Sequence, residues 1–130
     1  MEGAPTILVV DDEYLIAAMI EDALTEAGFQ VVMVGSAEQA ISRLKDDKAA
    51  YRALVTDISG LGEMDGWDIA KAGREIDPTL PVVYVSAAPP PEWAANGVPD
   101  SLFIPKPFAP AQIVSAVSQL INAVPPGANE

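Results

Sequence analysis

The stretch ILVVDDE, residues 7–13, places a short apolar run directly before three acidic residues. The run, residues 7–10, is rich in β-branched side chains and continuous rather than alternating, which is typical of a parallel strand covered on both faces. Similar runs follow at residues 31–34, 53–55, 82–85 and 102–104. The pattern predicts five parallel strands.

Segments with helical periodicity separate or follow these runs. An apolar face in the first of them ends at Gly28, a residue that favours helix C-termini. Ser36 and Gln39 have the spacing of a capping box, and Asp77-Pro78 is a helix-ending pair. We expect helices over residues 15–24, 37–44, 67–76 and 113–124, the last closed by Pro125-Pro126-Gly127.

Residues 87–100, between the fourth and fifth runs, differ from the other connections because they are rich in proline, which lacks a backbone donor. The prolines leave residues 92–97 free to be helical, and we expect at most one or two turns around residues 92–96. Trp93 is the large apolar side chain there. It either packs in one conformer or lies exposed as a binding hot spot. We expect low local stability in this segment.

Strands that alternate with helices indicate a doubly wound α/β domain, because right-handed crossovers place helices on both faces of a parallel sheet. The strand order is not readable from the alternation. We expect a single domain over residues 1–130, with a core of about 5–123 and a loose tail at 124–130. In such sheets, ligands bind beyond the carboxyl ends of the strands.

Composition narrows the function further. The chain has 130 residues and a net charge of −12, the wrong sign for neutralising nucleic-acid phosphates. It has no cysteine and no histidine, which excludes disulfides, thiol nucleophiles, imidazole metal ligands and serine-histidine triads on this chain. Apolar runs are far too short to span a bilayer and the start has no basic leader region. We expect a cytoplasmic protein that binds neither nucleic acid nor membrane.

Chemically useful side chains stand where the predicted strands end. Each has an ordinary structural explanation: an acidic residue caps a helix or starts a turn, a serine caps a helix, and a lysine is commonly solvated. Their joint position at one sheet edge is more informative than any single residue. They are Asp11, Asp12 and Glu13 after the first run, Asp57 after the third, Ser86 after the fourth and Lys106 after the fifth.

This set of residues suits phosphoryl transfer with a divalent cation. Mg²⁺ takes oxygen ligands, typically one or two carboxylates, which Asp12 and Asp57 could supply. Asp11 beside them is costly without a cation because like charges repel. Asp57 would then be a nucleophile that forms an aspartyl phosphate, and Lys106 and the Ser86 hydroxyl would neutralise charge on the phosphoryl oxygens.

The chain resembles the receiver domains of bacterial two-component response regulators over about residues 5–123. The carrying motifs are ILVVDDE with Asp11 and Asp12, LVTD with Asp57, the pair Asp65-Gly66, VVYVSA with Ser86, and IPKPF with Lys106-Pro107. The resemblance implies a flavodoxin-like strand order 2-1-3-4-5, a divalent cation such as Mg²⁺, and a phosphohistidine kinase as the donor. It also implies a cis bond between Lys106 and Pro107.

The resemblance assigns a role to each site residue. Asp57 is the phosphoacceptor, and Phe103 is either a switching aromatic or an ordinary buried strand residue. The metal ligands implied are Asp12 directly, Asp11 through water, Asp57 and the Ser59 carbonyl, whereas Ser86 follows the phosphoryl group and Lys106 pairs with it. The loop ISGLGEM, residues 58–64, departs from the family pattern: it is one residue longer and lacks a proline. Gly60 and Gly62 lead us to expect a mobile loop.

Three functions are compatible with these residues. The leading hypothesis is a stand-alone receiver, not an enzyme on other substrates, that signals by phosphorylation-dependent protein binding or acts as a phosphate sink. The chain ends soon after Lys106, so we expect its output to be another protein. The alternative is a pseudo-receiver, an acidic interaction module without turnover. A Mg²⁺-dependent phosphohydrolase is disfavoured because Ser59 stands two places after Asp57, where a second acid would be needed.

Overall fold

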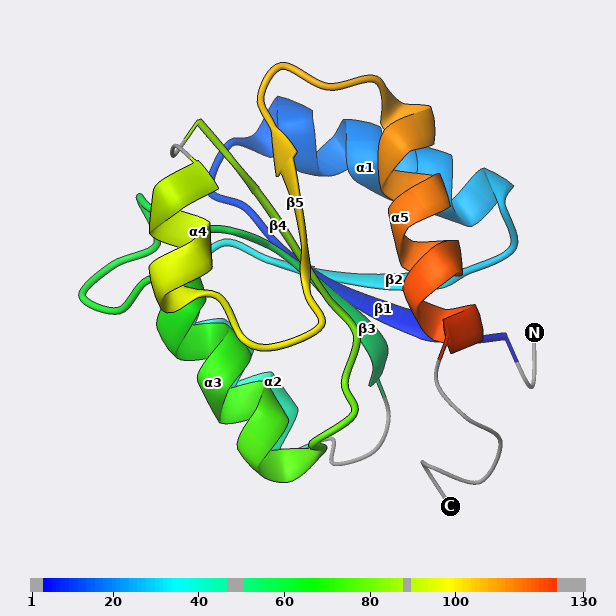
Figure 1. Cartoon of the computed structure of the whole chain (residues 1–130). Helices are drawn as coiled ribbons and strands as arrows, with labels where there is room; N and C mark the ends of the chain where they lie inside the picture. The colour runs from blue at the N-terminus through cyan, green and yellow to red at the C-terminus, as the bar shows by residue number, and fades with distance from the viewer. Residues whose placement is uncertain (1–3, 47–50, 88–89, 124–130) are drawn as a thin grey trace.

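A computed structural model describes residues 4–46, 51–87 and 90–123 as a parallel sheet covered on both faces (Figure 1). The order of the five strands is β2-β1-β3-β4-β5, which confirms both the doubly wound prediction and the order implied by the resemblance. The strands are β1 (Thr6–Val10), β2 (Gln30–Val34), β3 (Tyr51–Asp57), β4 (Val82–Ser86) and β5 (Leu102–Pro105).

The helices lie in two layers, with α1 beside α5 on one face and α2, α3 and α4 on the other (Figure 1). Each predicted helix is present, and α3 is fixed at its start by a capping box between Asp65 and Asp68. Val124 and the residues after it lie outside the described part of the chain. The helices are α1 (Tyr14–Glu26), α2 (Ala37–Asp46), α3 (Gly66–Ile76), α4 (Pro90–Asn96) and α5 (Pro110–Ala123).

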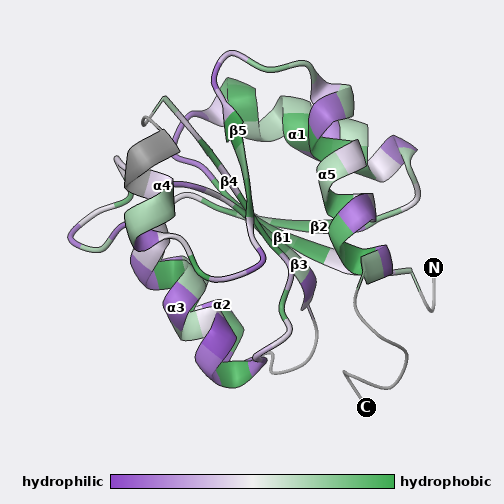
Figure 2. Cartoon of the chain, in the orientation of Figure 1, coloured by the Kyte–Doolittle hydropathy of each residue, from purple (hydrophilic) through white to green (hydrophobic). Residues whose placement is uncertain are grey.

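The continuous apolar strands pack against two hydrophobic cores, one on each face of the sheet. Leu8 and Val10 of β1 face the cluster under α2 and α3, whereas Ile7 and Val9 face the cluster under α1 and α5. All four side chains are buried, and Figure 2 shows the apolar colouring that runs through the strands. Burial on both faces explains why these strands read as unbroken apolar runs. No helix in the described ranges is long and apolar enough to cross a membrane.

The short fourth helix is confirmed, but it begins earlier than expected. It has seven residues and includes Pro90 and Pro91, which precede the predicted helical turns around residues 92–96. Proline is tolerated in the first turn because the backbone N–H groups there have no partner within the helix. The helix ends at Asn96, as the spacing predicts.

Trp93 packs rather than lying exposed. Its indole Nε1 donates to Ser101 Oγ at 2.9 Å, and its ring lies 6.3 Å from that of Phe103 between centroids. Both backbone groups of Val98 are also held: its N–H donates to Tyr84 Oη at 3.1 Å, and its carbonyl accepts from Ser101 Oγ at 2.7 Å. These bonds fix the connection from α4 to β5. The expected low stability of the segment stays a prediction.

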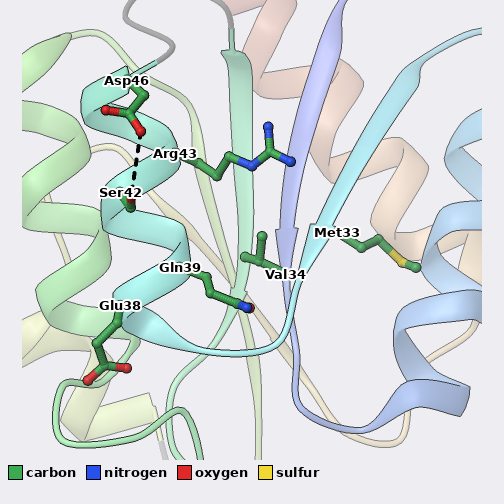
Figure 3. Close-up of a pocket in the computed structure, with 7 residues that line it drawn as sticks. All are labelled: Met33, Val34, Glu38, Gln39, Ser42, Arg43 and Asp46. Carbon is green, nitrogen blue, oxygen red and sulfur yellow. Dashed lines mark hydrogen bonds between the residues drawn. The ribbon is translucent and has the colours of Figure 1, made fainter.

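The junction of β2 and α2 forms a surface hollow (Figure 3). At the start of α2, Ser36 Oγ accepts from Gln39 N at 3.2 Å, while Gln39 Oε1 accepts from Gly35 N at 3.1 Å. The predicted cap is therefore present, with the glutamine bonded one residue earlier than in a standard capping box. The hollow is lined by Met33, Val34, Glu38, Gln39, Ser42, Arg43 and Asp46.

Candidate functional site

The parallel register brings the predicted site residues to one edge of the sheet. Asp57 ends β3 opposite Val85 of β4, and Ser86 ends β4 opposite the last residue of β5. The backbone N–H of Lys106 donates to the Ser86 carbonyl at 3.1 Å, which holds the lysine at this edge. The bond between Lys106 and Pro107 is cis, as the resemblance implies.

The Lys106 ammonium meets three carboxylates. Its Nζ lies 2.9 Å from Glu13 Oε1, 3.1 Å from Asp57 Oδ2 and 3.5 Å from Asp11 Oδ2. Burial alone would lower the pKa of Lys106, but its hydrogen bonds to Glu13 and Asp57 and the nearby negative charges outweigh burial and raise it. The lysine therefore stays charged throughout the physiological pH range.

Asp11 is a buried carboxylate with one oxygen only partly compensated. Its Oδ1 accepts from the Glu13 N–H at 2.8 Å. Its Oδ2 is the one buried side-chain polar atom without a hydrogen-bond partner in the described ranges, although Lys106 lies within ion-pair distance. Burial raises the pKa of Asp11, and the charge of Asp57 raises it further. An oxygen in this state is suited to a cation or to a water molecule bound to one.

Asp57 is fixed on both of its carboxylate oxygens. Oδ1 accepts from the Ile58 N–H at 2.7 Å, and Oδ2 accepts from Lys106. The side chain is buried, as expected for the last residue of a central strand. The neighbouring Thr56 hydroxyl donates to the Asp57 carbonyl at 2.7 Å. The carboxylate is thus held in one orientation toward the acidic edge.

The acidic side chains are close enough to share a cation. Asp11, Asp12, Glu13 and Asp57 each offer an oxygen, and these oxygens all lie within 4.8 Å of one another. Carboxylate oxygens are the ligands that Mg²⁺ prefers, and a cation would also relieve the repulsion among them. The donor set and the Asp11 oxygen that accepts no hydrogen bond therefore fit a Mg²⁺ site.

The loop after β3 is shaped by its two glycines. Gly60 and Gly62 have φ values of 80° and 112°, which residues with side chains rarely adopt. A Cβ at Gly60 would lie 3.0 Å from Asp12 Oδ2, so the loop packs directly against the acidic cluster. Leu61 between them is buried, and its carbonyl accepts from the Ala37 N–H at 2.8 Å. The loop is anchored at its middle, and its expected mobility stays a prediction.

The remaining predicted site residues occupy suitable positions, but their roles stay predictions. Ser86 is buried at the end of β4, and Ser59 is exposed in the loop after β3. Phe103 is half-buried on β5 against Trp93. The contact of Glu13 with Lys106 was not predicted: the sequence places Glu13 in the acidic run after the first strand but assigns it no role. Glu13 is the N-cap residue of α1, yet its side chain makes no capping bond.

Comparison of the sequence with models of protein families shows which family has this arrangement. The model of the response regulator receiver domain matches residues 7–118. The chain belongs to the response regulator receiver family. Its acidic cluster is typical of the receiver Mg²⁺ site, and receivers are not enzymes beyond the chemistry of their own phosphorylation.

Similarity to individual proteins supports the family assignment. A solved response regulator receiver protein from Sinorhizobium medicae is 49% identical with a TM-score of 0.89, covering 95% of this chain and 98% of that one. Chemotaxis protein CheY of Thermotoga maritima is 31% identical over 88% of this chain and 95% of CheY. The C4-dicarboxylate transport transcriptional regulatory protein DctD of Rhizobium meliloti is 30% identical over 89% of this chain, which spans only 25% of DctD.

The Asp11 carboxylate is buried and is repelled by the charge of Asp57, so the substitution Asp11→Asn should change the stability of the protein. Without metal at pH 7, we expect the variant to be more stable than the wild type by about 1 kcal/mol, because it removes a buried, repelled charge. With saturating Mg²⁺, we expect the order to reverse, because the variant lacks one carboxylate of the cluster and gains less free energy from cation binding than the wild type. Thermal unfolding with EDTA and with MgCl₂ measures both.

The pH dependence of this difference has a definite sign. The pKa of Asp11 is raised in the folded state, so its protonation favours folding below its usual value of 3.8, and this contribution is lost as pH rises through the higher folded pKa. The metal-free advantage of Asp11→Asn should therefore shrink on acidification. An advantage that grows toward low pH would contradict the assigned burial of the charge.

Proposed function

We propose that the protein accepts a phosphoryl group from the phosphohistidine of a sensor histidine kinase onto Asp57. The single observation that carries this proposal is the Asp57 carboxylate, which lies 3.1 Å from the Lys106 ammonium and has an oxygen within 4.8 Å of oxygens of Asp11 and Asp12. A nucleophile flanked by a fixed cation and a metal-binding cluster suits phosphoryl transfer, which depends mainly on positioning and charge neutralisation.

The transfer step follows from these positions. A carboxylate oxygen of Asp57 attacks phosphorus, the bond from phosphorus to the kinase imidazole nitrogen breaks, and its electron pair remains on that nitrogen. The product is an acyl phosphate on Asp57. Lys106 pairs with the phosphoryl oxygens, and the Ser86 hydroxyl donates to one of them. These 130 residues contain no histidine, so the phosphohistidine of the proposed donor lies outside them.

Cation binding completes the proposal. Asp11, Asp12 and Asp57 would hold Mg²⁺ or another divalent cation, together with the Ser59 carbonyl. The bound cation would supply positive charge to the phosphoryl oxygens. Phe103 on β5 contacts Trp93 of α4. We propose Phe103 as the residue through which phosphorylation of Asp57 alters the surface formed by α4 and β5.

The proposed mode of action is that of a stand-alone receiver over residues 1–130 in the cytoplasm. It would bind a downstream protein when phosphorylated or act as a phosphate sink. The match to nearly the whole of CheY supports this proposal. Among the described residues, the large exposed apolar side chains are Tyr14, Leu15 and Met19, all in the first half of α1, the helix that begins directly after the acidic run. Exposed apolar side chains on this helix favour contact with a protein partner, and the net charge disfavours nucleic acid.

Intact-mass measurement with acetyl phosphate and phosphorylated histidine kinases tests the proposal. With MgCl₂ we expect one added phosphoryl group, and with EDTA we expect none. Transfer from at least one kinase would exclude the pseudo-receiver alternative. A wild-type protein that gains no phosphoryl group from any donor in MgCl₂ would instead establish that alternative and overturn the proposed function.

A further inference from the structure

The shortest contact of the Lys106 ammonium is with Glu13 rather than with Asp57. Nζ lies 2.9 Å from Glu13 Oε1 and 3.1 Å from Asp57 Oδ2, and both contacts are hydrogen bonds. The two residues are 93 positions apart and meet where α1 begins and β5 ends. The proposed phosphoryl-binding lysine is therefore shared with a carboxylate outside the transfer step.

Glu13 has a fixed backbone, and among the described residues its side chain bonds to Lys106. Its N–H is held by Asp11 Oδ1 at 2.8 Å, which sets the start of α1. Its side chain makes no capping bond and is 56% exposed. Neither helix capping nor core packing explains where the carboxylate lies.

A phosphoryl group on Asp57 would compete with the carboxylates for the N–H donors of Lys106. An ammonium has three N–H donors, and three carboxylates already surround the Lys106 ammonium. The new phosphoryl oxygens would need one or more of these donors, so an existing contact would weaken. The Glu13 oxygen also lies within 4.8 Å of the Asp57 oxygen in the cluster, so it would repel the added negative charge.

We propose that Glu13 is a positioning residue that holds Lys106 in the unphosphorylated protein and competes with the phosphoryl group for it. This inference rests on the proposed phosphorylation of Asp57. Glu13 opposes the phosphorylated state in two ways: it retains the lysine, and it repels the phosphoryl charge. A receiver with this residue neutralised binds a phosphoryl group on Asp57 more favourably.

The test is Glu13→Gln, which keeps the length of the side chain and removes its charge. Beryllofluoride, a phosphoryl mimic, is titrated at saturating MgCl₂ while the amide NMR signals of Ile58 and Lys106 are followed. We expect its dissociation constant to fall about five-fold, the size of one unit-charge repulsion over several ångströms in a partly solvated site. The matched control is Glu26→Gln, which makes the same charge change at the exposed far end of α1 and should bind as the wild type does.

Two further measurements separate competition for Lys106 from a structural role. Because Glu13 is exposed, the difference between Glu13→Gln and the wild type should narrow as NaCl is raised, which a packing defect would not produce. The Mg²⁺ affinity of each protein is measured alone. Unchanged or weaker beryllofluoride binding by Glu13→Gln overturns the inference. A Glu13→Gln variant that binds Mg²⁺ too weakly to be saturated also overturns it. Failure of the wild type to bind beryllofluoride would instead count against the proposed function.

Discussion

Asp57→Asn should abolish phosphorylation by acetyl phosphate and by histidine kinases. The amide that replaces the carboxylate is nearly isosteric but is not a nucleophile toward phosphorus, so no acyl phosphate forms. The other carboxylates near Lys106 do not substitute, because only Asp57 lies at the end of the central strand with both of its oxygens fixed. Intact mass in MgCl₂ should show no added phosphoryl group.

Loss of folding would not explain this result. In Asp57→Asn, Lys106 keeps its contacts with Glu13 and Asp11, and one charge is removed from a crowded cluster. We therefore expect a melting temperature no lower than that of the wild type without metal. Asp22→Asn, an exposed change on α1, is the matched control and should label fully. Equal labelling of Asp57→Asn and the wild type would show that another residue is the phosphoacceptor.

The sheet was predictable because local sequence and tertiary burial agree along the inner strands β1, β3 and β4. Residues 7–10 are apolar on both faces because two cores cover them, so their pattern carries the fold directly. The start of α4 was less predictable. Proline in a helix interior is disruptive, but Pro90 and Pro91 stand in the first turn, where their missing donors cost nothing. Whether a proline is compatible with a helix depends on its position in that helix, and the composition of the segment does not show where the helix begins.

The candidate site likewise had residues whose proximity the sequence predicted and contacts that it did not predict. Asp11, Asp57 and Lys106 were predictable, because residues that directly follow parallel strands must share one edge. The Glu13 contact was not, because it depends on the direction of a long side chain at a helix start. The packing of Leu61 was also missed, since the flanking glycines suggested mobility while the tertiary structure buries the residue between them.

Gly66→Ala should destabilise the protein by about 3 kcal/mol, the upper range for an overpacked site. The Gly66 N–H donates to the Ile58 carbonyl at 2.8 Å, which brings the start of α3 against the end of β3. An added Cβ would overlap the Asp57 carbonyl oxygen and would lie 2.9 Å from Ile58 Cα. Backbone atoms must move to make room, whereas a flexible side chain could rotate away. Chemical denaturation measures the loss of stability.

The atoms that would be displaced belong to the phosphoacceptor segment, so Gly66→Ala should also weaken Mg²⁺ binding. A shift of the Asp57 backbone moves its carboxylate relative to Asp11 and Lys106, which directly follow β1 and β5. Gly35→Ala is the matched control, because a Cβ there meets nothing within 4 Å and its φ lies outside the left-handed region. We expect that control to change stability by less than about 0.5 kcal/mol and to bind Mg²⁺ normally. Equal stabilities for the two alanine variants would contradict the tight contact between α3 and β3. This contact requires glycine directly after Asp65, which explains why the Asp65-Gly66 pair accompanies the acidic site in this sequence.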